Sequence, residues 1–284
     1  MERTVGATPP RVLTIAGTDS GGGAGAAADL RAMAACGVHC CVAVTAVTVQ
    51  NSLGVSGVHP VPPETVAAQI ETVAADIGLD AVKTGMLASA AIIEAVAGAC
   101  DRSGIGVGRP TPLVVDPVAA STYGDQLLPD DALDAFRALL FPRATLITPN
   151  LDEVRLLVGV DVHDRAAQYD AAVLLHRFGS RYVLVKGGHL REDLDSCVDL
   201  LYDGRTFVEL PGPRFDTGDT HGSGDNMASA IASGLARGLS VPEAVALGKR
   251  YVVEAVRHSY PLGAGHGPVS PLWAVRPWWE DGVP

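Results

Sequence analysis

The segment Thr220–Asp225 reads T-H-G-S-G-D and combines a glycine turn with a carboxylate at the start of a helix-prone stretch. Glycines let the backbone approach a ligand, and the free N–H groups of a helix N-terminus attract anions such as phosphate. Asp225 falls in the first helical turn, where the helix dipole keeps a carboxylate ionised and able to accept a proton from a hydroxyl. The pattern indicates a phosphate site beside a base, although an aspartate here can also simply cap the helix.

A second glycine-rich turn, Gly17–Gly25, lies between a strand-like run and a helix-prone stretch. It indicates a turn that binds a small molecule, or a tight turn without a ligand. Neither glycine turn matches the G-x-x-x-x-G-K-[ST] loop. Gly23, Gly25 and Ala28 satisfy the dinucleotide pattern G-x-G-x-x-A, but no Asp or Glu occurs from position 30 to position 63. Because that pattern needs an acidic residue about 20 positions later, a nicotinamide or flavin site is disfavoured.

The charge balance narrows the partners that the chain can bind. Its 284 residues hold 21 Lys and Arg against 32 Asp and Glu, a formal net charge of -11. Because contact with nucleic acid or an anionic membrane needs clustered Lys and Arg, we expect neither partner. A bound phosphate must instead be held by backbone dipoles and a few chosen cations.

The composition also predicts a folded protein with a large core. Hydrophobic residues make up 48% of the chain and charged residues 19%, which excludes a disordered protein. No apolar run is as long as a bilayer-spanning helix, and the start has no apolar signal-peptide core. The five Cys residues form no C-x-x-C pair, so neither a disulfide frame nor a zinc cage is expected. We therefore expect a cytoplasmic protein with reduced thiols.

Short apolar runs alternate with helix-prone stretches, which is typical of a parallel sheet covered by helices. We expect strands at 11–16, 40–49, 81–84, 112–116, 145–148 and 182–185. We expect helices at 24–36, 63–76, 89–100, 129–140, 150–158, 166–178, 222–237 and 241–256. Two late runs, 196–202 and 206–210, flank Asp203-Gly204 and predict an antiparallel hairpin at the sheet edge. Because no linker or repeat is visible, we expect one domain over 1–284, with a flexible segment at 1–10.

Eight motifs occur in an order that resembles one family. They are L-T-I-A-G-T-D-S-G-G-G-A-G at 13–25, T-A-V-T-V-Q-N-S at 45–52, K-T-G-M-L at 83–87, V-V-D-P-V at 114–118, I-T-P-N-L-D-E at 147–153, V-K-G-G-H at 185–189, T-H-G-S-G-D at 220–225 and G-A-G-H-G-P-V at 263–269. From about position 12 to 266 the chain resembles the bacterial hydroxymethylpyrimidine/phosphomethylpyrimidine kinases of thiamine biosynthesis, within the ribokinase-like superfamily. The resemblance implies an α/β fold, a three-layer αβα sandwich whose central sheet is mostly parallel with an antiparallel edge hairpin.

The same resemblance implies the chemistry. Such kinases use ATP and Mg²⁺ and transfer the γ-phosphoryl group to a primary alcohol. The family enzyme phosphorylates a pyrimidine alcohol and then its monophosphate, which gives the diphosphate. The expected partners are therefore a small-molecule substrate and a second copy of the chain in a homodimer.

On the acceptor side, the resemblance assigns Gln50 to the edge of the aminopyrimidine. Its carboxamide offers a donor and an acceptor side by side, as an amino group next to a ring nitrogen requires. Met86 matches an apolar position near the ring. Gly17, Asp29 and Val118 match the other substrate-side positions.

On the phosphate side, Asn150 and Glu153 match the N-x-x-E element that organises Mg²⁺ and phosphate, often through water. Asp116 could join this acidic set, because a hard cation prefers oxygen ligands. Lys186 matches the lysine near the transferring phosphates. The remaining nucleotide and anion-hole positions, which lie ahead of the expected base Asp225, are Thr220, Gly222, Ser223 and Gly224.

Two departures from the family pattern keep other substrates open. The base position is Cys in most of these pyrimidine kinases and Asp225 here, as is usual in the sugar-kinase branches. Ala119 and Ala120 stand where family members usually carry Met and a bulkier residue, and S-T-Y-G-D follows them. The alternatives are a pyridoxal or pyridoxine kinase, which performs the same chemistry on another ring, and a non-catalytic pyrimidine-binding paralogue.

Overall fold

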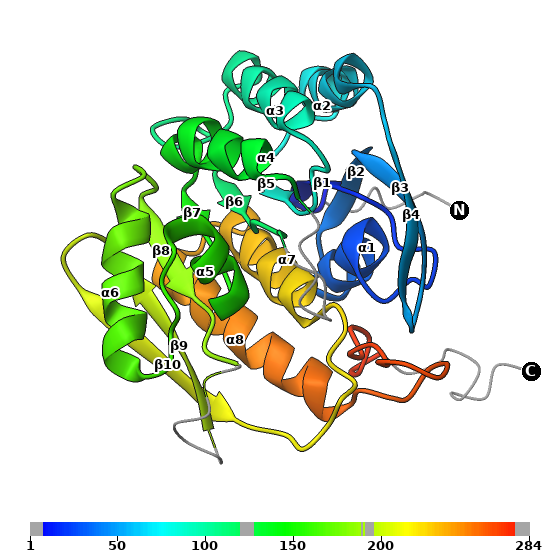
Figure 1. Ribbon diagram of the computed structural model, residues 1–284. Helices are drawn as coiled ribbons and strands as arrows, with labels where there is room; N and C mark the ends of the chain where they lie inside the picture. The colour runs from blue at the N-terminus through cyan, green and yellow to red at the C-terminus, as the bar shows by residue number, and fades with distance from the viewer. Residues whose placement is uncertain (1–7, 120–127, 189, 191–195, 276–284) are drawn as a thin grey trace, which may run out of the picture.

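The computed structural model describes residues 8–119, 128–188, 190 and 196–275. Its centre is an eight-stranded sheet in the order β10-β9-β8-β7-β6-β5-β1-β2 (Figure 1). The strands are β1 Arg11–Ala16, β2 His39–Val44, β5 Ala81–Thr84, β6 Leu113–Val115, β7 Leu146–Ile147, β8 Tyr182–Val185, β9 Ser196–Tyr202 and β10 Phe207–Pro213. Pairing is parallel from β2 to β8 and antiparallel through β9 and β10. The predicted parallel sheet with an antiparallel edge hairpin is confirmed.

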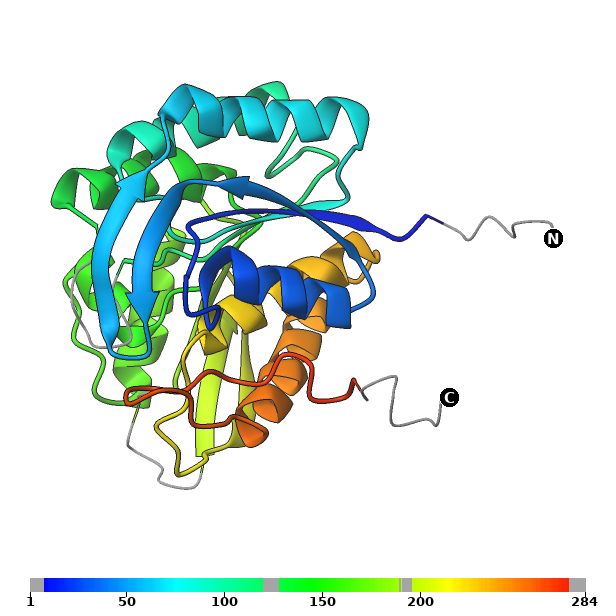
Figure 2. The same ribbon diagram turned by 90° about the vertical axis from the view of Figure 1, so that its right-hand side faces the viewer.

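Helices cover both faces of this sheet (Figures 1 and 2). One layer holds α1 Gly25–Ala35, α7 Ser223–Ala236 and α8 Val241–Arg257, and the other holds α2 Pro63–Asp76, α3 Ala90–Arg102, α4 Asp130–Ala135, α5 Leu151–Val158 and α6 Arg165–His176. Strand residues alternate between two cores, with Val12 packed beside α7 and Leu13 and Ile15 packed beside α2 and α3. The predicted three-layer arrangement is therefore confirmed. None of the described helices combines the length and apolarity needed to cross a bilayer.

The predicted strand at 40–49 is instead two strands in different sheets. After β2 the chain enters β3 (Ala46–Asn51), which pairs antiparallel with β4 (Gly54–Pro60) in a two-stranded sheet that we call the flap (Figure 2). The sequence of β4, G-V-S-G-V-H-P, has neither an apolar run nor a clean alternation, so no strand is expected there.

The break between β2 and β3 occurs at Thr45. Its N–H makes the last bond to the main sheet, at 3.1 Å from the Ala16 carbonyl, and its hydroxyl donates to the Met86 carbonyl at 2.6 Å. The Gln69 side chain bonds both the N–H and the C=O of Val44, which closes the outer edge of β2. The bond from Thr45 to Met86 and the bonds from Gln69 to Val44 therefore turn the chain out of the main sheet after β2.

The helix predicted at 129–140 is also divided. α4 is followed by a π-helical turn at Phe136–Leu140 and a 3₁₀ turn at Phe141–Arg143. Pro142 lacks an N–H and so ends the helical hydrogen bonding. The other predicted helices and strands are confirmed to within a few residues at their ends.

The carboxyl ends of the parallel strands meet at one edge of the sheet. Gly17, Gly85, Asp116, Thr148 and Lys186 directly follow β1, β5, β6, β7 and β8. Ligands of open α/β sheets bind at this edge, so the topology gathers these five positions around one site.

Residues 263–269, which we call the clasp, tie the flap to the loop before α7. The His266 N–H donates to the carbonyl of Ser52, in the turn of the flap, at 3.0 Å. The backbone N–H of His221, in the loop before α7, donates to the Gly267 carbonyl at 3.1 Å. Gly265 lies so close to the flap that a Cβ there would be 1.8 Å from the Ser52 carbonyl oxygen.

Candidate active site

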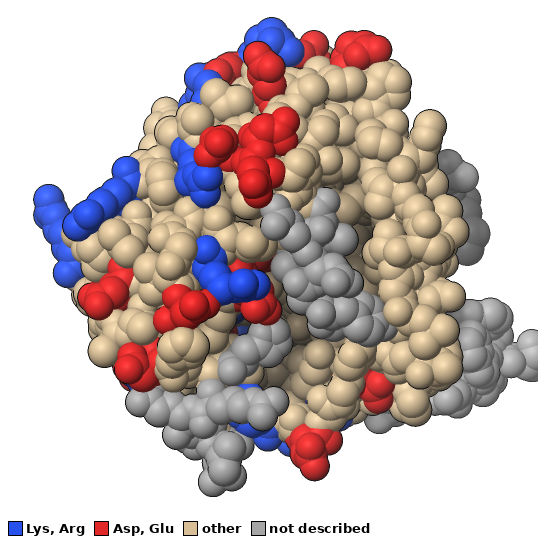
Figure 3. All heavy atoms as spheres, viewed as in Figure 1, with Lys and Arg blue, Asp and Glu red and all other residues tan. Residues whose placement is uncertain are grey.

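A cavity of about 400 Å³ lies at the carboxyl ends of the parallel strands, with walls from the flap and the N-terminus of α7. All the site residues expected from the sequence line it except Asp29 and Asn150. On the face shown in Figure 3 the flap, at the right, carries few charges. Lys and Arg are interspersed with Asp and Glu on the left and at the top of the same face. Inside the cavity, Lys186 offers a positive charge to a phosphate.

The two glycine turns pack against each other in the cavity wall. Gly222 is the N-cap of α7 with φ of 77°, and a Cβ there would lie 2.0 Å from the Gly23 carbonyl oxygen. Only glycine fits this contact and this backbone conformation. At the start of α7 the Ser223 N–H donates to the Thr220 carbonyl at 3.1 Å. Among the described residues the N–H groups of Gly224 and Asp225 have no acceptor, so they are available to an anion in the cavity.

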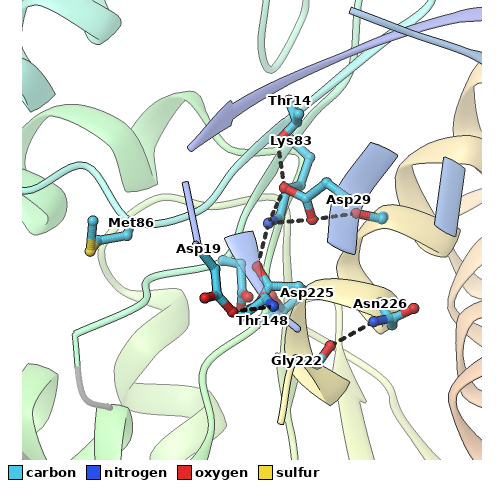
Figure 4. Close-up of polar contacts among 12 residues, drawn as sticks. Thr14, Asp19, Asp29, Lys83, Met86, Thr148, Gly222, Asp225 and Asn226 are labelled. Atoms are coloured by element: carbon cyan, nitrogen blue, oxygen red, sulfur yellow. Dashed lines mark hydrogen bonds and ion pairs between the residues drawn. The ribbon is translucent and has the colours of Figure 1, made fainter. Parts of the chain in front are cut away.

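Asp225 is not used as a helix cap, because α7 has no side-chain cap bond. Its side chain is 14% exposed, and its Oδ1 lies 3.0 Å from the Nζ of Lys83 (Figure 4). Within the described part of the chain, Lys83 is the only hydrogen-bond partner of this carboxylate. The Asp225 carboxylate thus lines the cavity with one oxygen held from behind.

Asp29 does not contact the cavity, in contrast to the substrate contact expected from the sequence. Its side chain is 0% exposed, and both of its oxygens lie 2.9 Å from the Lys83 Nζ. The hydroxyls of Thr14 and Ser229 donate to the same carboxylate at 2.5 and 2.7 Å. Its hydrogen-bonding capacity is therefore used inside the protein, one layer behind Asp225.

The phosphate side of the cavity holds Lys186 among buried carboxylates. The Lys186 Nζ lies 2.9 Å from Oδ1 of Asp116 and 4.0 Å from Oε2 of Glu153. Burial alone would raise the pKa of Asp116, but Lys186, Lys83 and the Thr148 hydroxyl together keep it below its ordinary value. Burial raises the pKa of Glu153 to about 8, with a further increase from Asp116. Lys186 therefore pairs chiefly with Asp116.

Asn150 acts through Glu153. It is the N-cap of α5, where its Oδ1 accepts from the Glu153 N–H at 2.8 Å while its own N–H donates to Glu153 Oε2 at 2.7 Å. This reciprocal capping box fixes the helix start and the Glu153 carboxyl together. The capping box thus orients Glu153, and the expected nucleotide contact of Asn150 stays a prediction.

The residues present fit a Mg²⁺ ion that is shared with nucleotide phosphates. Asp116 and Glu153 offer buried carboxyl oxygens to the same part of the cavity. In the described ranges no group of three or more His, Cys, Asp or Glu is arranged to hold a metal by itself. Mg²⁺ is usually bound through one or two carboxylates plus phosphates and water, so two carboxylates suffice.

The acceptor side is lined by the flap and the first glycine turn. Gln50 of β3 places its amide 3.4 Å from Nε2 of His221, and a Cβ on Gly17 would lie 2.5 Å from the Met86 methyl. Met86 therefore packs directly over the glycine turn. Val118 forms another part of the wall.

His221 and Asp19 were not expected from the sequence reasoning. Nε2 of His221 lies 2.9 Å from Oδ2 of Asp19, whose carboxylate also accepts from the N–H groups of Gly21, Gly23 and Ala24. Burial would raise the pKa of Asp19, but His221 and these N–H groups lower it. The position of both residues inside the two glycine motifs was the available signal, because a carboxylate can order a glycine turn by accepting its N–H groups.

The comparisons with known proteins agree with this geometry. A family model described as phosphomethylpyrimidine kinase matches residues 19–270. The chain belongs to this family. The hydroxymethylpyrimidine/phosphomethylpyrimidine kinase of Mycobacterium tuberculosis is 59% identical over 270 residues, which are 95% of this chain and 96% of that protein. A thiamine biosynthesis bifunctional protein of Geobacter sulfurreducens is 46% identical over 93% of this chain and 53% of its own length.

Among solved structures, the ADP complex of Bacillus subtilis pyridoxal kinase is similar with a TM-score of 0.85 and 34% identity. The match covers 94% of this chain and 99% of that one. The expected ribokinase-like fold and the expected kinase family are confirmed. This phosphomethylpyrimidine kinase family member is therefore a phosphotransferase.

Proposed function

We propose that this kinase transfers the γ-phosphoryl group of ATP to the hydroxymethyl group of 4-amino-5-hydroxymethyl-2-methylpyrimidine, and then to the resulting monophosphate, in thiamine biosynthesis. The observation that carries the proposal is the Asp225 carboxylate, which caps no helix and lies in the cavity wall at the first turn of α7. A carboxylate beside a row of helical N–H groups brings a base and a phosphate site together.

The proposed reaction is an in-line attack of the acceptor oxygen on the γ-phosphorus, in which the bond from that phosphorus to the β,γ-bridging oxygen breaks and ADP leaves. Asp225 accepts the hydroxyl proton as the new P–O bond forms. The N–H groups of Gly222, Gly224 and Asp225, with Lys186, stabilise the charge on the transferring oxygens, while the Ser223 N–H is bonded to the Thr220 carbonyl. Mg²⁺, held by Asp116 and Glu153 directly or through water, would neutralise phosphate charge when bound. Positioning and electrostatics supply most of the acceleration in such transfers.

The acceptor ring is assigned to the space between Gln50 and Met86. The Gln50 carboxamide can turn from His221 to the ring edge, where it offers both a donor and an acceptor. Gly17 makes room for the Met86 side chain, because a Cβ there would lie 2.5 Å from the Met86 methyl, and Met86 in turn offers an apolar surface to the ring. Val118 adds an apolar wall, as an aromatic ring requires.

The first test is the substitution Asp225→Asn, with Asp131→Asn as the matched control. Both are first-turn aspartates of a helix, but Asp131 is exposed on α4. ATP consumption with the pyrimidine alcohol should show kcat lowered by about 10²–10⁴-fold in Asp225→Asn and unchanged in Asp131→Asn. Wild-type kcat in Asp225→Asn would show that another group takes the proton.

The substrate is tested with a panel of the pyrimidine alcohol, its monophosphate and pyridoxal. We expect the highest kcat/KM for the two pyrimidines, together with a loss of that preference in Gln50→Ala. A preference for pyridoxal would favour the second candidate, a pyridoxal kinase, which the similarity to the Bacillus subtilis enzyme supports. Binding without turnover of any acceptor would indicate a non-catalytic paralogue.

The Mg²⁺ requirement, the homodimer and the cytoplasmic location are parts of the same proposal. Exposed Val47 and Val49 on the outer face of the flap support a covered surface there, with 48% and 62% of their area accessible. Light scattering of the purified protein measures the oligomeric state, and chelation with EDTA followed by readdition of Mg²⁺ measures the metal requirement.

A further inference from the structure

Lys83 of β5 is a fully buried lysine whose three donors meet three carboxylate oxygens. Its Nζ lies 2.9 Å from each oxygen of Asp29 and 3.0 Å from Oδ1 of Asp225. A lysine is almost never fully buried unless it is paired, and an ammonium group has three N–H donors. Figure 4 shows Lys83 between the two carboxylates. Gly85 also lies close to the ammonium group, because a Cβ there would be 2.9 Å from the Nζ.

Asp29 connects this lysine to three further elements. It lies on α1 and accepts from Thr14 of β1 and from Ser229 of α7. Ser229 is one helical turn after Asp225, so α7 is held twice, directly through Ser229 and through Lys83 at Asp225. This arrangement fixes the rotation of α7 relative to β1 and β5, and hence the direction of the Asp225 side chain.

The positive charge of Lys83 is shared between Asp29 and Asp225, which leaves Asp225 able to act as a base. Burial raises the pKa of Asp29 to about 6, although Lys83 opposes the rise. Burial alone would lower the pKa of Lys83, but Asp29, Asp225 and Asp116 raise it. At neutral pH Lys83 is therefore ionised and Asp29 is its counter-charge. A lysine with no second partner would place its whole charge on Asp225 and weaken it as a base.

We propose that Lys83 is a positioning residue that acts through Asp225. It holds Oδ1 from behind so that the other oxygen faces the acceptor hydroxyl, and Asp29 anchors it and offsets its charge. The inference rests on the proposed role of Asp225 as the base. It gives Asp29 a function as an anchor of that base in place of the substrate contact expected from the sequence.

The test is a double-mutant cycle between the buried pair and Asp225. Because Lys83→Met alone leaves Asp29 charged and unpaired in the core, the main variant is Lys83→Met/Asp29→Asn, which removes both charges and keeps hydrogen-bonding groups for Thr14 and Ser229. Thermal melting and ADP binding report whether the fold is retained. We expect kcat about 10–100-fold lower, with KM for ATP within about threefold of wild type.

In the Asp225→Asn background, the same pair of changes should lower kcat by less than about threefold, because the residue through which Lys83 acts is already gone. The matched control is Lys249→Met/Asp199→Asn, which removes another buried Lys–Asp pair, joined at 2.8 Å, that does not contact Asp225. Its effect on kcat should be the same in both backgrounds.

Two outcomes overturn the inference and are distinguishable. The first outcome is that the kcat losses of Lys83→Met/Asp29→Asn and of Asp225→Asn multiply in the combined variant, or that Lys83→Met/Asp29→Asn keeps wild-type kcat. In either case Lys83 does not act through Asp225, and the assignment of Asp225 as the base stands. If Asp225→Asn itself keeps wild-type kcat, the proposed base is wrong and the positioning role is overturned with it.

Discussion

Burial sets the protonation of Glu153, and this has a measurable effect on stability. Its side chain is 3% exposed and its pKa is raised to about 8, well above the ordinary value of 4.5. A raised pKa means that the folded state binds the proton more tightly than the unfolded state. The stability that Glu153 contributes is therefore fully present below about pH 4.5 and is lost as the pH rises through about 8.

We expect the wild-type protein without Mg²⁺ or nucleotide to lose more stability between pH 6 and pH 8.5 than Glu153→Gln does. The difference should reach at least about 1 kcal/mol, or about 2–4 °C in Tm. The measurement is thermal melting of both proteins across this range. Other buried groups such as Asp29 titrate equally in the two proteins, so parallel curves would contradict the raised pKa.

At the residue scale, the sequence identified the side chains of the cavity better than those behind it. Gln50, Lys186 and Asp225 were expected from motifs, and all three line the cavity. The K-T-G-M-L motif predicts no role for Lys83, and the family resemblance places Asp29 on the substrate side. Sequence shows the type of a residue and not its burial, and burial in the structure is what separates Asp29 from Asp225.

The start of α5 shows how one helical element positions a site residue. The capping box joins Asn150 and Glu153 by two bonds, and α3 starts with a simpler cap in which Ser89 accepts from the Ile92 N–H at 3.3 Å. Replacing either cap residue by Ala should destabilise the protein by about 1 kcal/mol.

Only Asn150→Ala should also change catalysis. Losing the bond from the Glu153 N–H to Oδ1 loosens the helix start that positions Glu153, although the N–H of residue 150 can still donate to Glu153 Oε2. We expect a severalfold increase in the Mg²⁺ concentration needed for half-maximal activity, measured by ATP consumption, and no such increase in Ser89→Ala. An equal Mg²⁺ dependence in the two variants, despite equal losses of stability, would show that Glu153 does not depend on the cap.

At the element scale, most of the sheet and its helices could be predicted because the apolar runs and their flanking glycines and prolines are local signals. The break at Thr45 could not, because it depends on Gln69 and Met86, which are far away in sequence. The flap strand β4 was missed for a related reason. It is stabilised by pairing with β3 and carries no periodicity of its own.

At the scale of the whole molecule, the clasp joins two walls of the cavity, the flap and the loop before α7. Gly265 is packed against the Ser52 carbonyl, so Gly265→Ala should push the flap away from α7. We expect KM for the pyrimidine alcohol to rise at least about fivefold, equivalent to about 1 kcal/mol. ADP binding, which we assign to the side of the cavity around Lys186 and α7, should be unchanged by calorimetry.

The control for this prediction is Gly57→Ala on the flap itself. A Cβ at Gly57 would meet Val49 at an ordinary distance of 3.4 Å, so KM should stay at the wild-type value. Equal KM values in Gly265→Ala and Gly57→Ala would show that acceptor binding does not depend on the clasp.

The point at which the chain leaves the main sheet at Thr45 has one more consequence. The hairpin that carries Gln50 pairs with no strand of the eight-stranded sheet and is held by Thr18, Ser20 and the clasp. The residues proposed to bind phosphate lie on the sheet and on α7. Changes in the hairpin that keep these contacts can therefore alter the choice of alcohol while the residues proposed to transfer the phosphoryl group stay in place. Such modularity offers a physical route by which one scaffold could diversify among vitamin precursors, and grafting the hairpin from a relative with another preference would be a direct way to redesign this enzyme.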